Sequence, residues 1–193
     1  MSEAPPSGSP GEVPVPEELA ESWQVIHGYS INVRPLRPSD LEIESAFVHG
    51  LSRESRYNCL LGGAINVSRS YIEQLITVDY RRDMALAAVV MMEQSEVLIG
   101  VARYVKDESA NDRPDRCEFA IVIADAWQGR GIGRMLMTKL ISVSRSRGIR
   151  EMFGEILATN HGMLMMVKSL GFRLGRHPDD ATVVRATLDL LPG

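Results

Sequence analysis

The sequence predicts a single domain of the mixed α/β or α+β class, in which helices flank a central sheet. Segments with apolar residues at helical spacing alternate with shorter apolar runs that are typical of buried strands. Their order also favours this class, because a short strand and two helices precede a meander of strands and then strand–helix–strand units. With 193 residues and 45% apolar content, the chain is long enough to bury one hydrophobic core.

The amino-terminal end is expected to lie outside this domain. Residues 1–22 are predicted to form a disordered leader, because residues 1–18 are rich in Pro, Ser, Gly and Glu and poor in large apolar side chains. The folded domain is expected to span residues 23–193, and the sequence contains no internal repeat. Its first strand is predicted at 31–34.

Two helices are expected next. Ser39-Asp40-Leu41-Glu42 has the spacing of a capping box, in which the serine oxygen accepts from helix N–H groups while the glutamate reaches back to the serine N–H. Apolar residues at helical spacing extend this helix to about Leu51. A second helix is predicted over 68–77, because its apolar residues share one face.

The rest of the chain predicts strands and helices in alternation. A helix is expected to begin at Ile132, because apolar residues recur at helical spacing from there to Val143. The strands are predicted at 84–92, 97–106, 116–124, 152–157, 172–175 and 183–188, and the last helix at 161–169.

Composition narrows the partners that we expect. The formal net charge of −4 gives no electrostatic basis for binding nucleic acid. No apolar run approaches the length of a membrane span and no secretory signal opens the chain, so no membrane partner is expected and a reducing cytoplasm is the predicted compartment. Cys59 and Cys117 lie in apolar contexts and predict neither a disulfide nor a zinc site, and the histidines lack ligand spacing, so no metal is expected.

The most informative segment is the glycine-rich run at 128–134, which joins an apolar strand to the helix that begins at Ile132. Gly129, Gly131 and Gly133 remove side chains where the backbone must approach a ligand closely. Unpaired N–H groups and the positive end of the helix dipole both favour an anion at such a place. Arg130 and Arg134 add positive charge. The run therefore predicts a phosphate site; the alternative is an ordinary glycine-rich turn.

Spacing excludes two common phosphate motifs. A Walker loop needs Gly, four residues and then Gly-Lys-Ser or Gly-Lys-Thr, and the chain contains no such string. A dinucleotide fingerprint needs its third glycine where Arg134 stands and an acidic residue at the end of the next strand. Neither condition is met.

The run resembles the pyrophosphate loop of the GCN5-related N-acetyltransferases (GNAT), whose pattern is Gln/Arg-x-x-Gly-x-Gly/Ala after a strand. Residues 128–133, Gln-Gly-Arg-Gly-Ile-Gly, meet every fixed position. The resemblance extends from about Tyr29 to about Leu190 and is greatest to the acetyltransferase domain of bacterial protein lysine acetyltransferases of the Pat type. Segments 34–40, 51–57, 99–104 and 117–120 carry it. It implies the GNAT fold, with a mixed, mostly antiparallel central sheet flanked by helices.

This resemblance also implies acetyl-CoA as the co-substrate. The loop amides, with Arg130 and Arg134, would hold the pyrophosphate, and the strand before the loop would bind the pantetheine arm like an extra strand. The residues expected to contact the cofactor are Ile121, Val122, Ile123, Gln128, Gly129, Arg130, Gly131, Ile132, Gly133, Arg134 and Asn160. Asn160 also stands where a helix N-cap would stand, and both roles stay open.

Glu118 is the candidate general base. Core packing does not explain an acid beside Phe119 and Ala120, and burial would raise its pKa toward a useful value. The resemblance places a catalytic glutamate here; the alternative is a glutamate on a solvated strand edge. Many relatives carry a tyrosine general acid seven residues after Asn160. Val167 stands at that position, so no general acid is assigned, which agrees with the Pat type and with a thiol of pKa about 8.5 leaving unprotonated.

The sequence thus predicts an enzyme that transfers acetyl from acetyl-CoA to a primary amine by direct attack in a ternary complex. The expected acceptor is the ε-amine of lysine in a protein. Two alternatives are a small-molecule amine acetyltransferase, acting on a polyamine, amino acid or aminoglycoside, and a non-catalytic acyl-CoA sensor. The oligomeric state does not follow from the sequence.

Overall fold

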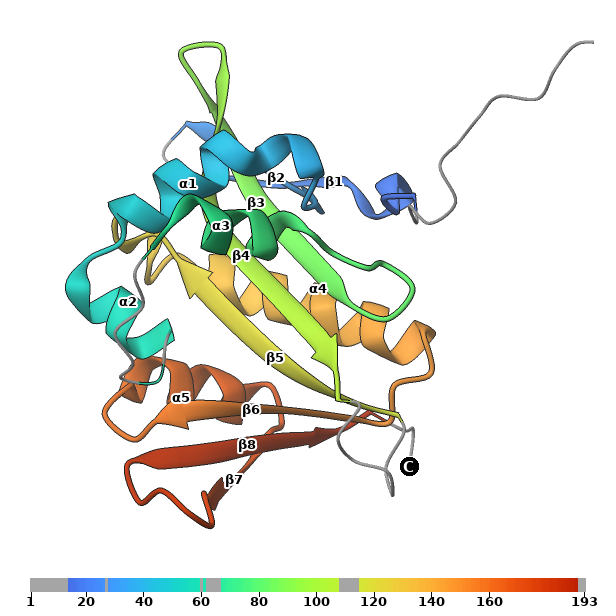
Figure 1. Ribbon diagram of the computed structural model, residues 1–193, viewed down its shortest axis with the longest axis vertical. Helices are drawn as coiled ribbons and strands as arrows, with labels where there is room; N and C mark the ends of the chain where they lie inside the picture. Colours follow the sequence, from blue (N-terminus) through green and yellow to red (C-terminus); the bar gives the residue numbers. More distant parts are fainter. Residues whose placement is uncertain (1–13, 27, 60, 62–66, 108–114, 191–193) are drawn as a thin grey trace, which may run out of the picture.

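Figure 1 shows a computed structural model of the chain, in which residues 14–26, 28–59, 61, 67–107 and 115–190 are described. Within these residues, eight strands form one sheet in the order β1-β2-β3-β4-β5-β6-β8-β7. Neighbouring strands are antiparallel except β5 and β6, which are parallel. The strands are β1 (Glu21–Ile26), β2 (Tyr29–Pro35), β3 (Met84–Met92), β4 (Ser95–Lys106), β5 (Arg116–Ile123), β6 (Glu151–Leu157), β7 (Arg173–Arg176) and β8 (Val183–Asp189).

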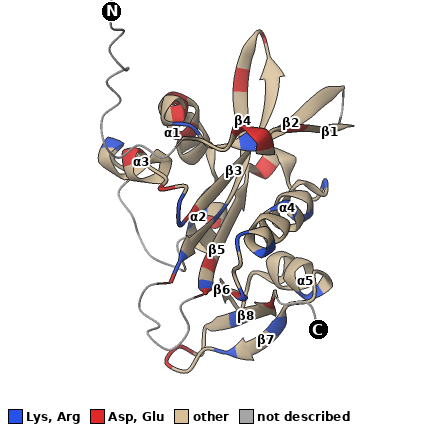
Figure 2. Cartoon of the chain, turned by 90° about the vertical axis from the view of Figure 1, so that its right-hand side faces the viewer, with Lys and Arg blue, Asp and Glu red and all other residues tan. Residues whose placement is uncertain are grey.

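Helices cover both faces of this sheet. Figure 2 shows α1 (Leu41–Gly50) and α3 (Arg69–Ile76) on one side and α4 (Ile132–Ser146) and α5 (His161–Ser169) on the other. The short helix α2 (Arg53–Cys59) contacts β5. Three short 3-10 helices also occur within the described residues: η1 (Glu17–Leu19), η2 (Pro38–Asp40) and η3 (Asp125–Trp127). None of the helices in the described part of the chain is both long and apolar enough to cross a membrane.

Strand β5 divides the apolar residues between two cores because its side chains alternate between the faces of the sheet. Cys117, Phe119 and Ile121 pack in the core under α4 and α5, whereas Val122 packs with the core under α1 and α3. Strand β3 is buried from Met84 to Val90 because it has a covered sheet face on both sides. Hence the apolar run of β3 is continuous rather than alternating.

The expected fold class and the mixed, mostly antiparallel sheet are confirmed. The predicted strands at 31–34, 84–92, 97–106, 116–124, 152–157, 172–175 and 183–188 correspond to β2, β3, β4, β5, β6, β7 and β8, with ends that differ by a few residues. The predicted helices correspond to α1, α3, α4 and α5. Ser68 caps α3, since its side chain accepts from the N–H of Tyr71.

The capping box predicted at Ser39 is wrong. Residues 38–40 form η2, and α1 begins at Leu41, so Asp40 rather than Ser39 precedes the helix. The Asp40 carboxylate instead accepts from the backbone N–H of Arg37, at 2.7 Å, and from both terminal nitrogens of the Arg34 guanidinium, at 2.7 and 2.9 Å. Because the Asp40 carboxylate is engaged in this buried ion pair, residues 38–40 form a 3-10 turn instead of the first turn of α1.

Two elements, β1 and α2, were not predicted. Strand β1 is exposed or half-buried along its length and therefore shows no apolar run. Helix α2 has no buried residue and hence no apolar stripe. Of the expected leader, residues 1–13 lie outside the described residues. Residues 14–22 contain η1 and the start of β1, so secondary structure begins before the expected boundary at Trp23. Glu17 of η1 also forms an ion pair with Arg37, at 2.7 Å.

Gly154 of β6 is a position where packing requires the absence of a side chain. A Cβ atom there would lie 2.6 Å from two ring carbons of Phe119, which is itself held against Phe172 in an edge-on contact. We therefore expect Gly154→Ala to lower the free energy of unfolding by about 1–3 kcal/mol, as overpacked cores do. Urea denaturation followed by circular dichroism would measure it. Gly162→Ala, in open space on α5, is the control and is expected to be neutral or stabilising.

Candidate active site

Strands β5 and β6 pair only where they start. Their parallel ladder joins Arg116 to Glu151 and ends where Glu118 meets Phe153. Beyond that point β5 continues to Ile123 and β6 to Leu157, and the two strands diverge. The other edge of β5 stays paired with β4 along its whole length. The second half of β5 therefore has one free backbone edge inside the sheet.

The polar groups on that free edge come from alternate residues of β5. The carbonyl of Arg116 accepts from Asp107, and the N–H of Ala124 donates to Ile99, so even-numbered residues between them direct their backbone groups at β4. The backbone groups of 119, 121 and 123 consequently point into the gap. Nε2 of Gln128 donates to the Ile123 carbonyl at 3.0 Å, and the remaining groups can pair with an extended ligand.

A loop at the open end of this gap leads directly into α4. Gly129 and Gly131 have φ of +70° and +83°, which side-chain-bearing residues rarely adopt. Gly131 occupies the N-cap position of α4 without a side chain to cap it, and the first backbone bond of the helix runs from the Met135 N–H to the Gly131 carbonyl. The N–H groups of 132–134 therefore have no helical acceptor, and they point with the positive end of the helix dipole toward an incoming anion.

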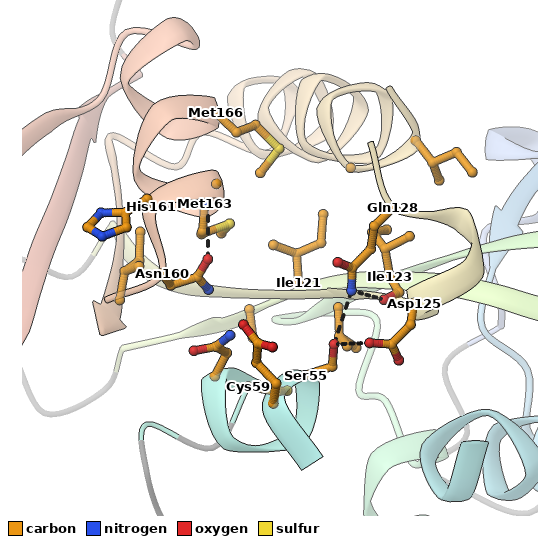
Figure 3. Close-up of a pocket in the computed structure, with 18 of the residues that line it drawn as sticks. Ser55, Cys59, Ile121, Ile123, Asp125, Gln128, Asn160, His161, Met163 and Met166 are labelled. Carbon is orange, nitrogen blue, oxygen red and sulfur yellow. Dashed lines mark hydrogen bonds between the residues drawn. The ribbon is translucent and has the colours of Figure 1, made fainter. Parts of the chain in front are cut away.

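The gap and the loop form one cleft of about 790 Å³. Figure 3 shows its walls: β5 lies behind, α5 and α4 on one side, and α2 on the other. Of the residues predicted from sequence, those lining the cleft are Glu118, Ile121, Val122, Ile123, Gln128, Gly129, Gly131, Ile132, Gly133, Arg134 and Asn160. Arg130 does not line it; its guanidinium lies 5.5 Å from the ring centre of Trp127, which does.

Three of these side chains also have structural partners. Asn160 is the N-cap of α5, since its side-chain oxygen accepts from the Met163 N–H at 3.2 Å (Figure 3), and its amide nitrogen remains available on the cleft wall. Arg134 donates to Ser169 Oγ at 2.6 Å. Gln128 donates to Ser55 Oγ on α2 as well as to the Ile123 carbonyl, each at 3.0 Å.

The wall formed by α2 was missed by sequence reasoning. The Asp125 carboxylate, just after β5, accepts from the backbone N–H and hydroxyl of Ser52, at 2.9 and 2.6 Å. It also accepts from the hydroxyl of Ser55, at 2.8 Å (Figure 3). These hydrogen bonds hold its pKa below the ordinary value. Together with Gln128 they brace α2 against the loop, so Glu54, Asn58 and Cys59 line the cleft opposite α5.

Glu118 lies on the wall where the two strands separate. Its side chain is reachable by solvent, but the surrounding cleft partly desolvates the carboxylate and raises its pKa above the ordinary value. Nearby Glu155 and Asp107 raise this pKa further, while Arg185 and Arg116 oppose them. A carboxylate with a raised pKa beside a free strand edge has the properties of a general base. Val167, which stands where many relatives carry a tyrosine general acid, is fully buried in the core.

The site thus combines a diverging strand pair that leaves one backbone edge free with a loop of unpaired helix N–H groups at its end, which is the arrangement expected for an acyltransferase that uses coenzyme A. The model of the acetyltransferase (GNAT) family matches residues 63–172. The chain belongs to this family and is an acetyl-CoA-dependent acetyltransferase. Among the described residues, no three His, Cys, Asp or Glu side chains gather as a metal site.

Relatives and solved structures agree with this assignment. The acetyltransferase PA5475 of Pseudomonas aeruginosa is 36% identical over 81% of this chain and 82% of its own length. The acetyltransferase Pat of Mycolicibacterium smegmatis is 28% identical over 88% of this chain, which spans only 48% of that protein. The GNAT domain of S. lividans PAT superposes with a TM-score of 0.78 and 26% identity, over 90% of this chain and 98% of the domain.

Proposed function

We propose that this enzyme acetylates the ε-amine of lysine in proteins, by direct attack of the amine on acetyl-CoA within a ternary complex. The observation that carries the proposal is the position of Glu118 beside the free edge of β5, where the thioester would lie. The similarity to the PAT GNAT domain over nearly the whole chain supports a protein acceptor.

The charge of the acceptor end of the cleft also supports an isolated ammonium as the acceptor. Glu118 and Glu155 line the cleft where β5 and β6 separate, and Arg185 pairs with one oxygen of Glu155, whereas Arg134 lies at the loop end of the cleft. A lysine side chain presents one positive charge on a long apolar stem and suits an acidic wall. The amine of a free amino acid stands beside its own carboxylate, which the same acidic wall would repel.

In the proposed reaction, the pantetheine arm pairs with the free edge of β5 and a backbone N–H of that edge polarises the thioester carbonyl. The loop at 128–134 holds the pyrophosphate. Glu118 takes a proton from the lysine ammonium, and the neutral nitrogen then attacks the carbonyl carbon. The carbon–nitrogen bond forms, the carbon–sulfur bond breaks, and coenzyme A leaves as the thiolate, while the second proton of the attacking nitrogen passes to solvent water to leave the neutral amide.

Labelled acetyl-CoA added to a bacterial lysate would test the acceptor class. A desalted and an undesalted sample would each receive the wild-type enzyme or Glu118→Gln, and label would be followed into protein lysines and into small molecules. We expect label on lysines of a few proteins that depends on the wild-type enzyme. Label in the small-molecule fraction alone would overturn the protein acceptor in favour of a metabolite amine. Intact acetyl-CoA binding with no label in either fraction would indicate a sensor.

A further inference from the structure

A second carboxylate stands across the gap from Glu118. Glu155 lies on β6 two residues beyond Phe153, the partner of Glu118 in the last rung of the parallel ladder. Side chains two residues apart on a strand share a face, so Glu118 and Glu155 project on the same side of the sheet, offset by about 7 Å along the strands. Both line the cleft. The two carboxylates are close enough for the charge of Glu155 to raise the pKa of Glu118.

One oxygen of Glu155 is occupied and the other is not. Arg185, its register partner on β8, places Nη2 2.6 Å from Oε1 of Glu155, and His177 places Nε2 3.1 Å from the same atom. Oε2 has no hydrogen-bond partner among the described residues and is not buried, so it remains for a ligand.

The histidine is oriented by its other nitrogen. The backbone N–H of Asp179 donates to Nδ1 of His177 at 3.2 Å. A nitrogen that accepts carries no proton, so the neutral imidazole has its proton on Nε2, which faces Glu155. Arg185 and His177 therefore hold Oε1 of Glu155 in place. Arg185 and Arg116 also act on Glu118, but through their charge alone.

We propose that Glu155 is the anchor for the acceptor ammonium: its free Oε2 binds the cation across the gap from Glu118, which then removes the proton. Arg185 and His177 position this anchor from the opposite side. The assignment rests on the proposed function for its biological acceptor, but the binding of a cation at Glu155 can be measured without turnover.

The test titrates n-butylammonium, a lysine side chain without its backbone, into enzyme saturated with coenzyme A. Binding is followed by the ¹³C shifts of labelled glutamate carboxyl groups. We expect Glu155→Gln to weaken the Kd about tenfold or more, because a partly buried charge-assisted contact is lost. Glu155→Asp, which keeps a carboxylate, should recover part of the affinity. Neutral n-butanol should not distinguish the variants.

Glu151→Gln is the matched control. It removes one carboxylate from the same face of β6, where Glu151 pairs with Arg116 at 2.8 Å, but Glu151 does not line the cleft. Wild-type affinity in Glu155→Gln, or an equal loss in Glu151→Gln, would overturn the proposal.

Steady-state kinetics with a capped lysine peptide give the second measurement. Glu155→Gln should raise KM about tenfold with kcat within threefold, and a fall in kcat at unchanged KM would contradict an anchoring role. If wild type acetylates no lysine peptide, the proposed function fails, while the ammonium titration still decides the role of Glu155.

Discussion

Replacement of Glu118 by glutamine is expected to lower kcat at least a hundredfold while the Kd for acetyl-CoA stays within about twofold. Glutamine has nearly the same shape but cannot accept a proton from the ammonium, and a positioned general base contributes about 10²–10⁴ to a rate. Acetyl-CoA should still bind, because the loop and the free backbone edge do not involve this carboxylate. Turnover assays and isothermal titration with the same protein preparation would separate the two quantities.

The pH dependence gives an independent check on Glu118. The carboxylate must be ionised to act, so kcat/KM should rise with pH through its pKa. That pKa lies above the ordinary 4.5, chiefly because the cleft desolvates the carboxylate and secondarily because Glu155 and Asp107 are near. The acidic limb should therefore lie above pH 4.5 in wild type and be absent from Glu118→Gln. An unchanged acidic limb in the variant would assign it to another group, and unchanged turnover would exclude Glu118 as the base.

Gly131→Val is expected to weaken coenzyme A binding more than tenfold. The φ of Gly131 is +83°, and a side chain there costs about 1–2 kcal/mol or forces the loop into another conformation. An added Cβ has room, with Trp23 the nearest group at 3.7 Å, so the strain of the backbone at positive φ, not a clash of the Cβ, is the expected cause. A rearranged loop would no longer direct the amides of 132–134 at the pyrophosphate.

Gly148→Val provides the control for this loop. Gly148 follows the other end of α4, has φ of +75° and also has no neighbour that an added Cβ would meet. Both variants should therefore lose similar stability in thermal denaturation, whereas only Gly131→Val should lose coenzyme A affinity by calorimetry. Equal affinity in the two variants would mean that the loop conformation does not matter for the cofactor.

Much of the fold could be predicted because its local patterns are strong. Strand β3 is covered on both faces and therefore reads as an unbroken apolar run, and the core-facing residues of α4 recur at helical spacing. Strand β1 and α2 could not be predicted in this way, since neither buries a residue completely. The start of α1 was predicted wrongly because the buried pair of Arg34 and Asp40, which overrides the local capping pattern, joins β2 to η2.

In the candidate site, too, the parts formed by consecutive residues could be predicted, whereas the parts formed by tertiary contacts could not. The glycine loop could be predicted because a strand, a turn and a helix start follow one another in sequence. The hydrogen bonds of Asp125 to Ser52 and Ser55 join segments that are about 70 residues apart in the sequence, with β3, β4 and β5 between them. No rule of sequence spacing predicts such a contact. The same holds for Glu155, which becomes notable only because β6 lies beside β5 and β8 supplies Arg185.

The gap between β5 and β6 also bears on aggregation. Free strand edges on a protein surface can recruit strands from other chains. Here the unpaired stretch lies in the interior of the sheet, closed at one end by the parallel ladder and flanked by α2 and α5 (Figure 3). A polypeptide strand, with side chains on both faces, would meet these helices, whereas the slender pantetheine arm would not. The enzyme can thus keep backbone donors ready for its cofactor without offering them to neighbouring molecules in a crowded cell.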